Sequence, residues 1–175
     1  AVVFCNRERG QAASTDAFLD RIEATGTPLV CLSSGAWRKQ VAGDLSTPGE
    51  SLAPWRADFD RAARESITPY RPDVGVLAGY MLITTAELCE RLPLLNLHPA
   101  EPGGPVGTWQ EVIWKLIASE SKKTGAMVHL VTDKVDEGPC VSYFTFPLRG
   151  ISYDQNWEEL QNHSLKTRIV LLSRI

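Results

Sequence analysis

Hydrophobic and polar residues alternate in blocks along the first hundred residues, and the blocks have the lengths of strands and helices. Continuous apolar runs are typical of strands that are buried on both faces of a sheet. The runs that we interpret as strands lie at residues 1–5, 28–32, 73–80 and 94–98. Apolar residues at helical spacing separate these runs and predict helices. The predicted helices extend from Ser14 or Thr15 to Gly26, over 57–67, and from Thr84 or Thr85 to Arg91.

The second part of the chain has a different pattern. Residues 99–107 are rich in proline and glycine and predict a loop, and Thr108 is positioned to cap a following helix. Two apolar runs, at 125–131 and 140–146, are joined by a short polar turn and predict neighbouring antiparallel strands. A terminal helix is expected from Asp154 onward. The side chains expected to face inward are Trp109, Val112, Ile113, Leu116 and Ile117 in the first of these helices, and Trp157, Leu160 and Ile169 in the second.

The order of these elements predicts the fold class. Alternating strands and helices favour an α/β fold with a mostly parallel open sheet, helices on both faces, and an antiparallel hairpin at one side. Residues 33–54 are polar and rich in glycine, serine and proline, so we predict no regular element there except a turn near Trp37. With 175 residues and neither a repeat nor a second core, the chain is expected to form a single domain over 1–175.

Composition and charge exclude several classes of function. Hydrophobic residues make up 43% of the chain and charged residues 22%, which is ordinary for a globular protein. The net charge of −3 argues against a nucleic-acid partner, and no apolar run is long enough to cross a membrane. Cys5, Cys31, Cys89 and Cys140 have no C-x-x-C spacing, so we expect buried free thiols and a reducing, cytoplasmic location.

Three polar residues near predicted strand ends have the chemistry of a proton-handling site. Asn96 and His98 are two residues apart and leave the same face of a strand, and Pro99 ends the pairing of that strand. Asp136 lies in an Asp-Glu-Gly-Pro turn between two apolar runs, a reversal that can bring its carboxylate to the same crevice. We favour a functional role, although Asn96 also fits a strand-end cap and Asp136 a simple turn former.

Other chemistries have weaker support in the sequence. His129 lies among apolar neighbours in a predicted strand, and we interpret it as a packed histidine that supports the site. A metal site from His98, His129 and Asp136 is conceivable, but no ligand motif supports it, so we expect no metal. Ser33-Ser34-Gly35 lacks the context of a nucleophile elbow, and the glycine motifs that bind dinucleotides or nucleoside triphosphates are absent from the sequence.

At these residues the chain resembles the glycinamide ribonucleotide formyltransferase family. That family carries an Asn-x-His-Pro strand end, present here as Asn96-Leu97-His98-Pro99, and a Thr-Gly-x-x-Val-His turn motif that continues to Asp-x-Gly, present here over residues 124–138. The segments Leu77–Met81 and Val2–Arg7 are also similar to segments of the family. The resemblance covers residues 1 to about 148.

The resemblance implies transfer of a formyl group from 10-formyltetrahydrofolate, as co-substrate, to a small amine, and glycinamide ribonucleotide in purine biosynthesis is the expected acceptor. It implies catalytic roles for Asn96, His98 and Asp136, supported by His129 and Thr124. The implied folate-binding residues are Leu77, Ala78, Gly79, Met81, Leu82, Ile83, Thr132, Asp133 and Val135. A formyltetrahydrofolate hydrolase or a non-catalytic folate-binding module is the alternative, and a homodimer is the expected assembly.

The chain departs from the family pattern in three places. In the family, a further strand and a Gly/Ser-rich phosphate loop come first, so we expect that strand and loop to be missing from residues 1–175. The segment after Pro99 reads Ala100–Pro105 in place of the usual aromatic-rich stretch, which changes the expected acceptor pocket. Leu82 occupies the position of a common arginine, so the folate contacts there are expected to differ.

Overall fold

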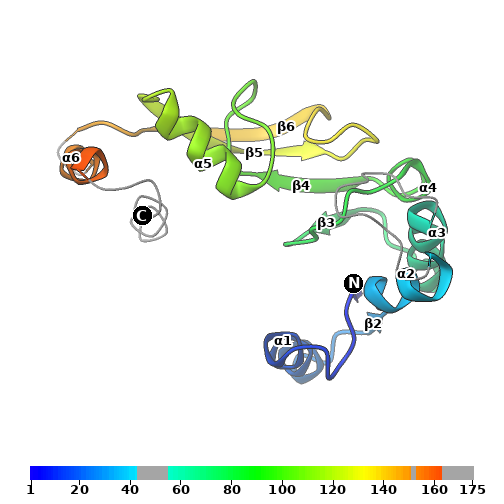
Figure 1. The fold of residues 1–175 in the computed structure, drawn as a ribbon. Helices are drawn as coiled ribbons and strands as arrows, with labels where there is room; N and C mark the ends of the chain where they lie inside the picture. Colours follow the sequence, from blue (N-terminus) through cyan, green and yellow to red (C-terminus); the bar gives the residue numbers. More distant parts are fainter. Residues whose placement is uncertain (43–54, 151–152, 163–175) are drawn as a thin grey trace. The chain divides into compact units, whose positions relative to one another are not determined.

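The computed structural model describes residues 1–42, 55–150 and 153–162 (Figure 1). The chain divides into two compact units, the first formed by Ala1–Leu95 with Val131–Val135 and the second by Asn96–Leu130 with the residues from Asp136 onward. The mixture of parallel strands and helices confirms the α/β class predicted from the sequence. One domain over the whole of 1–175 stays a prediction.

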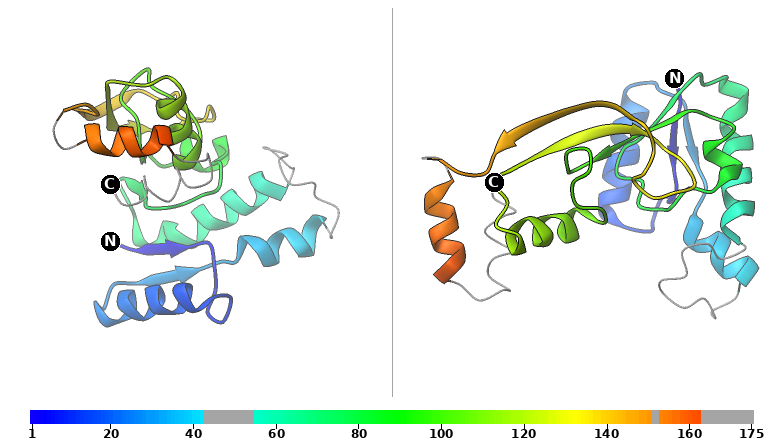
Figure 2. Two further views of the ribbon diagram at one scale, coloured as in Figure 1. Left: turned by 60° about the vertical axis from the view of Figure 1, so that its left-hand side comes forward. Right: turned by 90° about the horizontal axis from the view of Figure 1, so that it is seen from above.

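The first unit opens with a small parallel sheet. Strand β1 (Val3–Cys5) pairs in parallel with β2 (Leu29–Cys31), and helix α1 (Ala13–Ala24) connects them (Figure 2). Leu19 of α1 is buried with 1% of its surface exposed. The chain turns after the helix at Gly26, whose φ of +70° favours glycine. The predicted cap at Ser14 or Thr15 is wrong, because Ala12, two to three residues earlier, occupies the N-cap position.

Helix α2 (Ser34–Ala42) corrects the prediction that residues 33–54 hold no regular element besides a turn near Trp37. Trp37 lies inside this helix. The Ser33 hydroxyl accepts a hydrogen bond from the Ala36 N–H at 3.1 Å, which satisfies one of the free donors at the helix start. A serine-rich segment is therefore the N-terminal cap of a helix here. The rest of that predicted loop lies outside the described residues.

Helix α3 (Trp55–Ile67) begins two residues before the predicted range, continues into the short 3-10 turn η2 (Thr68–Tyr70), and packs against α4 (Ala86–Cys89). The centre of the first unit is a hydrophobic cluster of three buried leucines. Those residues are Leu88, Leu92 and Leu94, and Ile67, Leu77, Cys89 and Val131 pack against them. This cluster joins the end of α3, α4, β3 and β4 through apolar burial.

Strand β3 (Gly75–Leu77) is shorter than the predicted run over 73–80, whereas β4 (Leu94–His98) has the predicted bounds. The Gly75 N–H donates to the Pro93 carbonyl at 2.9 Å where β3 neighbours the beginning of β4. The chain leaves β3 at Gly79, where φ is +67°, and this left-handed conformation ends the extended segment.

The second unit contains the predicted hairpin, which the structure confirms. Strand β5 (Lys123–Leu130) pairs in antiparallel register with β6 (Cys140–Pro147), with an irregularity between Val128 and His129, and β5 neighbours the last part of β4. Residues of β5 alternate between buried and less buried positions, as expected for a strand with one covered face.

Two helices complete the described part of the second unit. Thr108 caps α5 (Trp109–Ala118) in a capping box with Glu111, which confirms the predicted helix start. Val112 is buried, but Trp109 is 45% exposed, so the predicted inward position of this tryptophan is wrong. Helix α6 (Asp154–Asn162) buries Leu160, and Ile169 lies outside the described residues.

The cysteines correct a second prediction. All four are free thiols, but Cys140 is exposed and the others are only half-buried, so their predicted burial is wrong. Three of them lie in three-residue strands or a four-residue helix near the surface of the first unit, where short elements leave side chains partly accessible. Among the described residues, no helix is long and apolar enough to cross a membrane.

Candidate active site

The three predicted catalytic residues come together within the second unit. Strand β4 supplies Asn96 and His98, and the turn between β5 and β6 supplies Asp136. The Asp136 carboxylate lies 3.3 Å from Nδ1 of His98 through one oxygen and 3.5 Å from Nε2 of His129 through the other. Nδ2 of Asn96 lies 3.2 Å from Nε2 of His129. The side chains of His98 and Asp136 are 4% and 11% exposed, so the cluster is largely shielded from water.

Both ring nitrogens of His98 lie next to oxygen acceptors. Its Nε2 lies 2.8 Å from the Pro105 carbonyl oxygen, and its Nδ1 faces the Asp136 carboxylate. Both partners are acceptors, so each ring nitrogen of His98 has to donate a proton to make a favourable contact. A neutral imidazole carries only one N–H. Only a doubly protonated ring can therefore donate to both oxygens.

His129 orients the amide of Asn96. The imidazole is 1% exposed, and its Nδ1 lies 2.9 Å from the Leu130 carbonyl, a pure acceptor, so Nδ1 donates there. Nε2 is then free to accept a hydrogen bond from Nδ2 of Asn96. Because that Nδ2 carries two protons, one remains for another acceptor. His129 thus holds the Asn96 side chain in one orientation.

The turn after β5 has the strained backbone that a positioned carboxylate often requires. Asp136 has a φ of +56°, in the left-handed region that aspartate tolerates better than most residues. Gly138 approaches the end of β5 so closely that a Cβ there would lie 1.7 Å from the Leu130 carbonyl oxygen. Only glycine allows the turn to approach this carbonyl, which is the one that fixes His129.

Thr124 is not brought to this cluster. It lies at the beginning of β5, five residues before His129, which corresponds to about 17 Å along a strand at roughly 3.4 Å per residue. Its hydroxyl is buried without a hydrogen-bond partner among the described residues. The structure therefore offers no contact through which Thr124 supports the catalytic residues.

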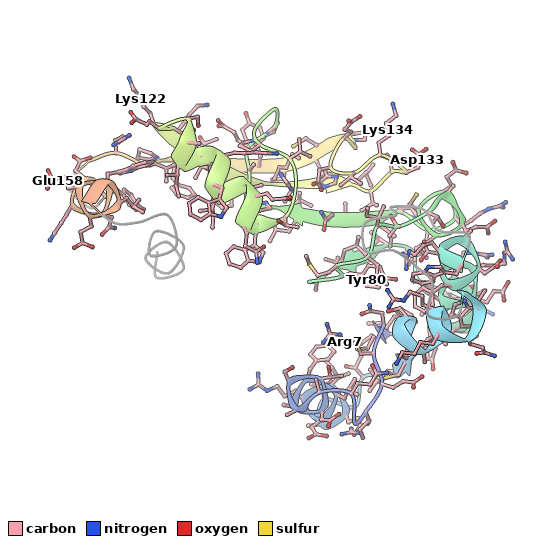
Figure 3. All side chains as sticks on the ribbon, in the orientation of Figure 1. Arg7, Tyr80, Lys122, Asp133, Lys134 and Glu158 are labelled. Atoms are coloured by element: carbon pink, nitrogen blue, oxygen red, sulfur yellow. The ribbon has the colours of Figure 1, made fainter. Side chains whose placement is uncertain are left out.

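The two predicted folate-binding segments both lie in the first unit. Leu77 begins one segment and Val131 precedes the other, and both pack against the leucine cluster at Leu94. The Val131 N–H also donates to the Leu94 carbonyl at 2.8 Å. Other apolar residues of the two segments are exposed to solvent: Met81 is 71%, Ile83 37% and Val135 48% exposed. Asp133 and Lys134 are exposed and point outward in Figure 3. The exposed apolar side chains of the two segments are therefore available to contact an apolar ligand.

A buried ion pair, which the sequence did not predict, holds the first of the two segments predicted to bind folate. Arg56 and Asp60 on α3 are 5% and 0% exposed and lie 3.2 Å apart. Arg56 donates to the Ile83 carbonyl at 2.5 Å, and Asp60 accepts from the Thr85 N–H at 2.6 Å. The four-residue spacing of Arg56 and Asp60 was the available signal, although Arg56 lies one residue before the helix predicted over 57–67.

Burial affects the titration of this region. Burial raises the pKa of the Asp60 carboxyl, against the opposing hydrogen bond from Thr85 and the charge of Arg56. Burial, with the nearby Asp60 charge, also raises the pKa of the Tyr80 phenol to about 12. The Tyr80 hydroxyl and Nη1 of Arg56 are buried without a hydrogen-bond partner among the described residues.

The Pro105 carbonyl is the second contact that sequence reasoning missed. It belongs to the proline- and glycine-rich loop. Every residue type has a backbone carbonyl, so the identity of residue 105 could not predict this contact with His98. Within the described ranges, no group of three or more histidine, cysteine, aspartate or glutamate side chains has an arrangement suited to a metal ion.

Comparisons with known proteins find relatives named as formyltransferases and deformylases. The phosphoribosylglycinamide formyltransferase of Saccharomyces cerevisiae is 37% identical over 90 residues, covering 47% of this chain and 42% of that protein. The formyltetrahydrofolate deformylase of Escherichia coli is 32% identical over 88 residues, covering 49% and 31%. The chain thus spans less than half the length of these curated relatives.

Solved structures share the fold. The glycinamide ribonucleotide transformylase 1 of Symbiobacterium toebii superposes with a TM-score of 0.66 at 24% identity, covering 97% of this chain and 68% of that one. The phosphoribosylglycinamide formyltransferase of Campylobacter jejuni gives 0.63 at 20% identity, covering 99% and 78%. Residues 19–166 match the formyl transferase family, which is most of the chain. The chain therefore belongs to the formyl transferase family.

Proposed function

We propose that this chain carries the formyl-transfer site of an enzyme that moves the formyl group of 10-formyltetrahydrofolate to the amine of glycinamide ribonucleotide. The observation that carries the proposal is the position of the His98 ring, whose Nε2 lies 2.8 Å from the Pro105 carbonyl oxygen and whose Nδ1 lies 3.3 Å from the Asp136 carboxylate. Relatives named as phosphoribosylglycinamide formyltransferases support the choice of acceptor.

The cluster suits attack of a neutral amine on a formyl carbon. As the new C–N bond forms, the formyl oxygen becomes an oxyanion, and preorganised donors stabilise it by about 2.7–4 kcal/mol each. The free N–H of the Asn96 amide and an N–H of the His98 imidazolium are the proposed donors. The amine proton passes to the Asp136 carboxylate directly or through a water. The oxyanion then re-forms the carbonyl while the bond between the formyl carbon and folate N10 breaks, and Asp136 returns the proton to N10.

One contact has to change before His98 can act in this way. Its Nε2 proton is engaged by the Pro105 carbonyl, while its Nδ1 proton is engaged by Asp136. In the proposed reaction the formyl oxygen replaces the Pro105 carbonyl as the acceptor at Nε2, and the Asp136 contact is kept. Catalytic hydrogen bonds commonly form only when substrate binds.

The folate is proposed to bind the first unit. Leu77, Ala78, Gly79, Met81, Leu82 and Ile83 form one proposed wall, and Thr132, Asp133 and Val135 the other. The first wall is tied to α3 through the Arg56–Ile83 hydrogen bond. The second is stiffened by a local turn in which the Thr132 hydroxyl bonds the backbone of Lys134.

A formyltetrahydrofolate deformylase is the second candidate, favoured by the relative from Escherichia coli that carries this name. Such an enzyme would direct water in place of the amine to the formyl carbon. The same imidazolium and amide donors would stabilise the oxyanion, so the difference lies in what the site admits as nucleophile.

A single assay separates these candidates. The chain is incubated with 10-formyltetrahydrofolate, with and without glycinamide ribonucleotide, and tetrahydrofolate, formate and formylated amine are measured. Transfer predicts tetrahydrofolate release that requires the amine and matches formylated product mole for mole. Formate release without amine would identify the deformylase, and folate binding without turnover would identify a non-catalytic module. A cytoplasmic location and a homodimer remain predictions that this assay does not address.

A further inference from the structure

Two free cysteines lie directly opposite each other on neighbouring strands of the first unit. Strand β1 carries Cys5 and strand β2 carries Cys31, and the parallel register pairs these two residues (Figure 2). The chain has four cysteines, and the formyl transfer proposed above uses none of them. The pairing of two thiols in register is therefore a feature that the proposed function does not explain.

Backbone hydrogen bonds fix this register. The Val3 N–H donates to the Pro28 carbonyl at 2.9 Å before the cysteine pair. The Leu32 N–H donates to the Cys5 carbonyl at 3.1 Å after it. A slip of one residue would break both bonds and turn the Cys31 side chain to the other face of the sheet. The pairing of the two strands therefore holds the two thiols as neighbours.

The two side chains leave the same face of the two-stranded sheet, because residues opposite each other in neighbouring strands share a face. Phe4, the residue before Cys5, leaves the other face, where its ring centre lies 6.4 Å from that of Phe59. Neighbouring strands are about 4.7–4.9 Å apart, and disulfides usually join residues whose Cα atoms are about 4.4–6.8 Å apart. The spacing of the strands therefore allows a disulfide between Cys5 and Cys31.

The same geometry would make that disulfide easy to reduce. Two Cβ atoms that leave one face in parallel are separated by about the strand spacing of 4.7–4.9 Å, whereas the Cβ atoms of a disulfide are usually about 3.5–4.5 Å apart. The strands must therefore approach each other slightly for the bond to form. A disulfide formed under such strain is more reducible than a structural one, and labile disulfides are typical of regulatory sites.

The surroundings of the pair suit a stepwise reaction. Both thiols are half-buried and so keep part of their surface open to a small reagent. Burial raises the pKa of the Cys31 thiol, and the adjacent Cys5 sulfur and the Glu8 carboxylate raise it further. A negative charge on one sulfur thus disfavours a second charge beside it, so the two thiols ionise one after the other. Thiol–disulfide exchange needs one thiolate at a time.

We propose that Cys5 and Cys31 form a reversible dithiol–disulfide pair, which is a modification site for low-molecular-weight disulfides such as oxidised glutathione. The thiolate of one cysteine attacks a sulfur of the small disulfide, forms a mixed disulfide and releases one small thiolate. The thiolate of the second cysteine attacks the protein sulfur of the mixed disulfide, forms the Cys5–Cys31 bond and releases the second small thiolate. The released thiolates take up the two cysteine protons, so the protein thiols are oxidised and the small disulfide is reduced. The bond closes a covalent loop that contains α1.

The test treats the folded chain with oxidised glutathione, blocks the remaining thiols with N-ethylmaleimide, and identifies tryptic peptides by mass spectrometry. The expected product joins the peptide that ends at Arg7 to the peptide of residues 22–38, with a mass about 2 Da below the sum of the reduced peptides. This link should exceed any link to the half-buried Cys89 by at least about tenfold, because strand pairing raises the effective concentration of one thiol at the other. In urea this preference should disappear.

Serine variants provide the matched controls. Cys5→Ser and Cys31→Ser should each abolish the link and leave the other cysteine as a mixed disulfide with glutathione. Cys140→Ser, at an exposed thiol, should keep the link. Millimolar reduced glutathione should return the linked form to two thiols. Mixed disulfides at both cysteines without a link, links to Cys89 in similar yield, an undiminished preference in urea, or a link that resists reduced glutathione would each overturn the proposal.

Discussion

The cluster around His98 and the region around β3 differ in how far they are shielded from water. In the second unit, both nitrogens of His98 and both nitrogens of His129 have partners within 3.3 Å. In the first unit, Val74 and Val76 are 51% and 68% exposed beside a cleft of about 880 Å³. The candidate chemistry is therefore preorganised by contacts of the second unit alone, while the first unit leaves apolar side chains near β3 uncovered.

This difference predicts which measurements each region controls. Substitutions in the His98 cluster should lower turnover with little effect on folding, because the cluster is small and locally braced. Substitutions around α3 should lower stability first, because Phe59, Ala63 and the Arg56–Asp60 pair of this helix are buried.

The largest effect is expected for the catalytic pair. His98→Ala and Asp136→Asn should each lower formyl-transfer turnover by about 10²–10⁴-fold, the range for a lost proton-transfer group or oxyanion donor. Asparagine is chosen because it tolerates the positive φ of residue 136. Glu137→Gln, an exposed neighbour in the same turn, is the control and should leave turnover within a factor of about two. Near-normal turnover of either first variant would remove that residue from the mechanism.

The buried ion pair of α3 should dominate stability. Arg56→Met leaves Asp60 buried without its partner and should lower the free energy of unfolding by about 3–5 kcal/mol, measured by urea denaturation. Arg61→Met, on the same helix but with 45% exposure and exposed partners, should cost less than about 1 kcal/mol. A similar loss in the two variants would show that the Arg56–Asp60 pair is not the element that holds Ile83 and Thr85.

A smaller effect on stability is expected in the second unit. Thr108→Ala removes the hydroxyl that accepts from the Glu111 N–H and should cost about 1 kcal/mol of unfolding free energy. Gln110→Ala changes an exposed residue in the same helical turn and should be nearly neutral. Turnover should stay unchanged in both, and a loss of turnover in Thr108→Ala alone would couple the start of α5 to the reaction.

The effect of Tyr80 should be confined to alkaline pH. Its pKa is raised by burial from 10.0 to about 12, so the unfolded chain loses this proton before the folded chain does. Stability should therefore be complete below pH 10 and fall as the pH rises from 10 to about 12. Tyr80→Phe should remove this part of the pH dependence, as followed by thermal unfolding at several pH values. An unchanged alkaline slope would show that Tyr80 titrates normally.

No effect is expected from chelation. In the proposed state both ring nitrogens of His98 carry protons that they donate to Pro105 and Asp136, so neither has a lone pair for a metal ion. Turnover should be the same before and after dialysis against a strong chelator. Loss of turnover that zinc restores would favour the metal alternative that the sequence left open.

The sequence by itself determined the structural features that depend only on residues close together in the chain. The two-residue spacing of Asn96 and His98, the capping box at Thr108 and the hairpin around Asp136 follow from strand and helix periodicity and from turn chemistry. These features need no knowledge of distant segments. For the same reason the bounds of β4 were predictable, whereas α2 was missed because its serine-rich start was interpreted as a loop.

Only the tertiary structure decided which groups meet across long stretches of chain. His129 contacts Asn96 from 33 residues away, and Arg56 holds Ile83 from 27 residues away. The Pro105 carbonyl that engages His98 is a backbone group and has no signature in residue type. Thr124 shares a motif with His129 but lies at the other end of β5, because distance along a strand grows with every residue. The spacing of residues in the sequence sets the direction of a side chain on its own helix or strand. The tertiary structure sets which distant residues that side chain contacts.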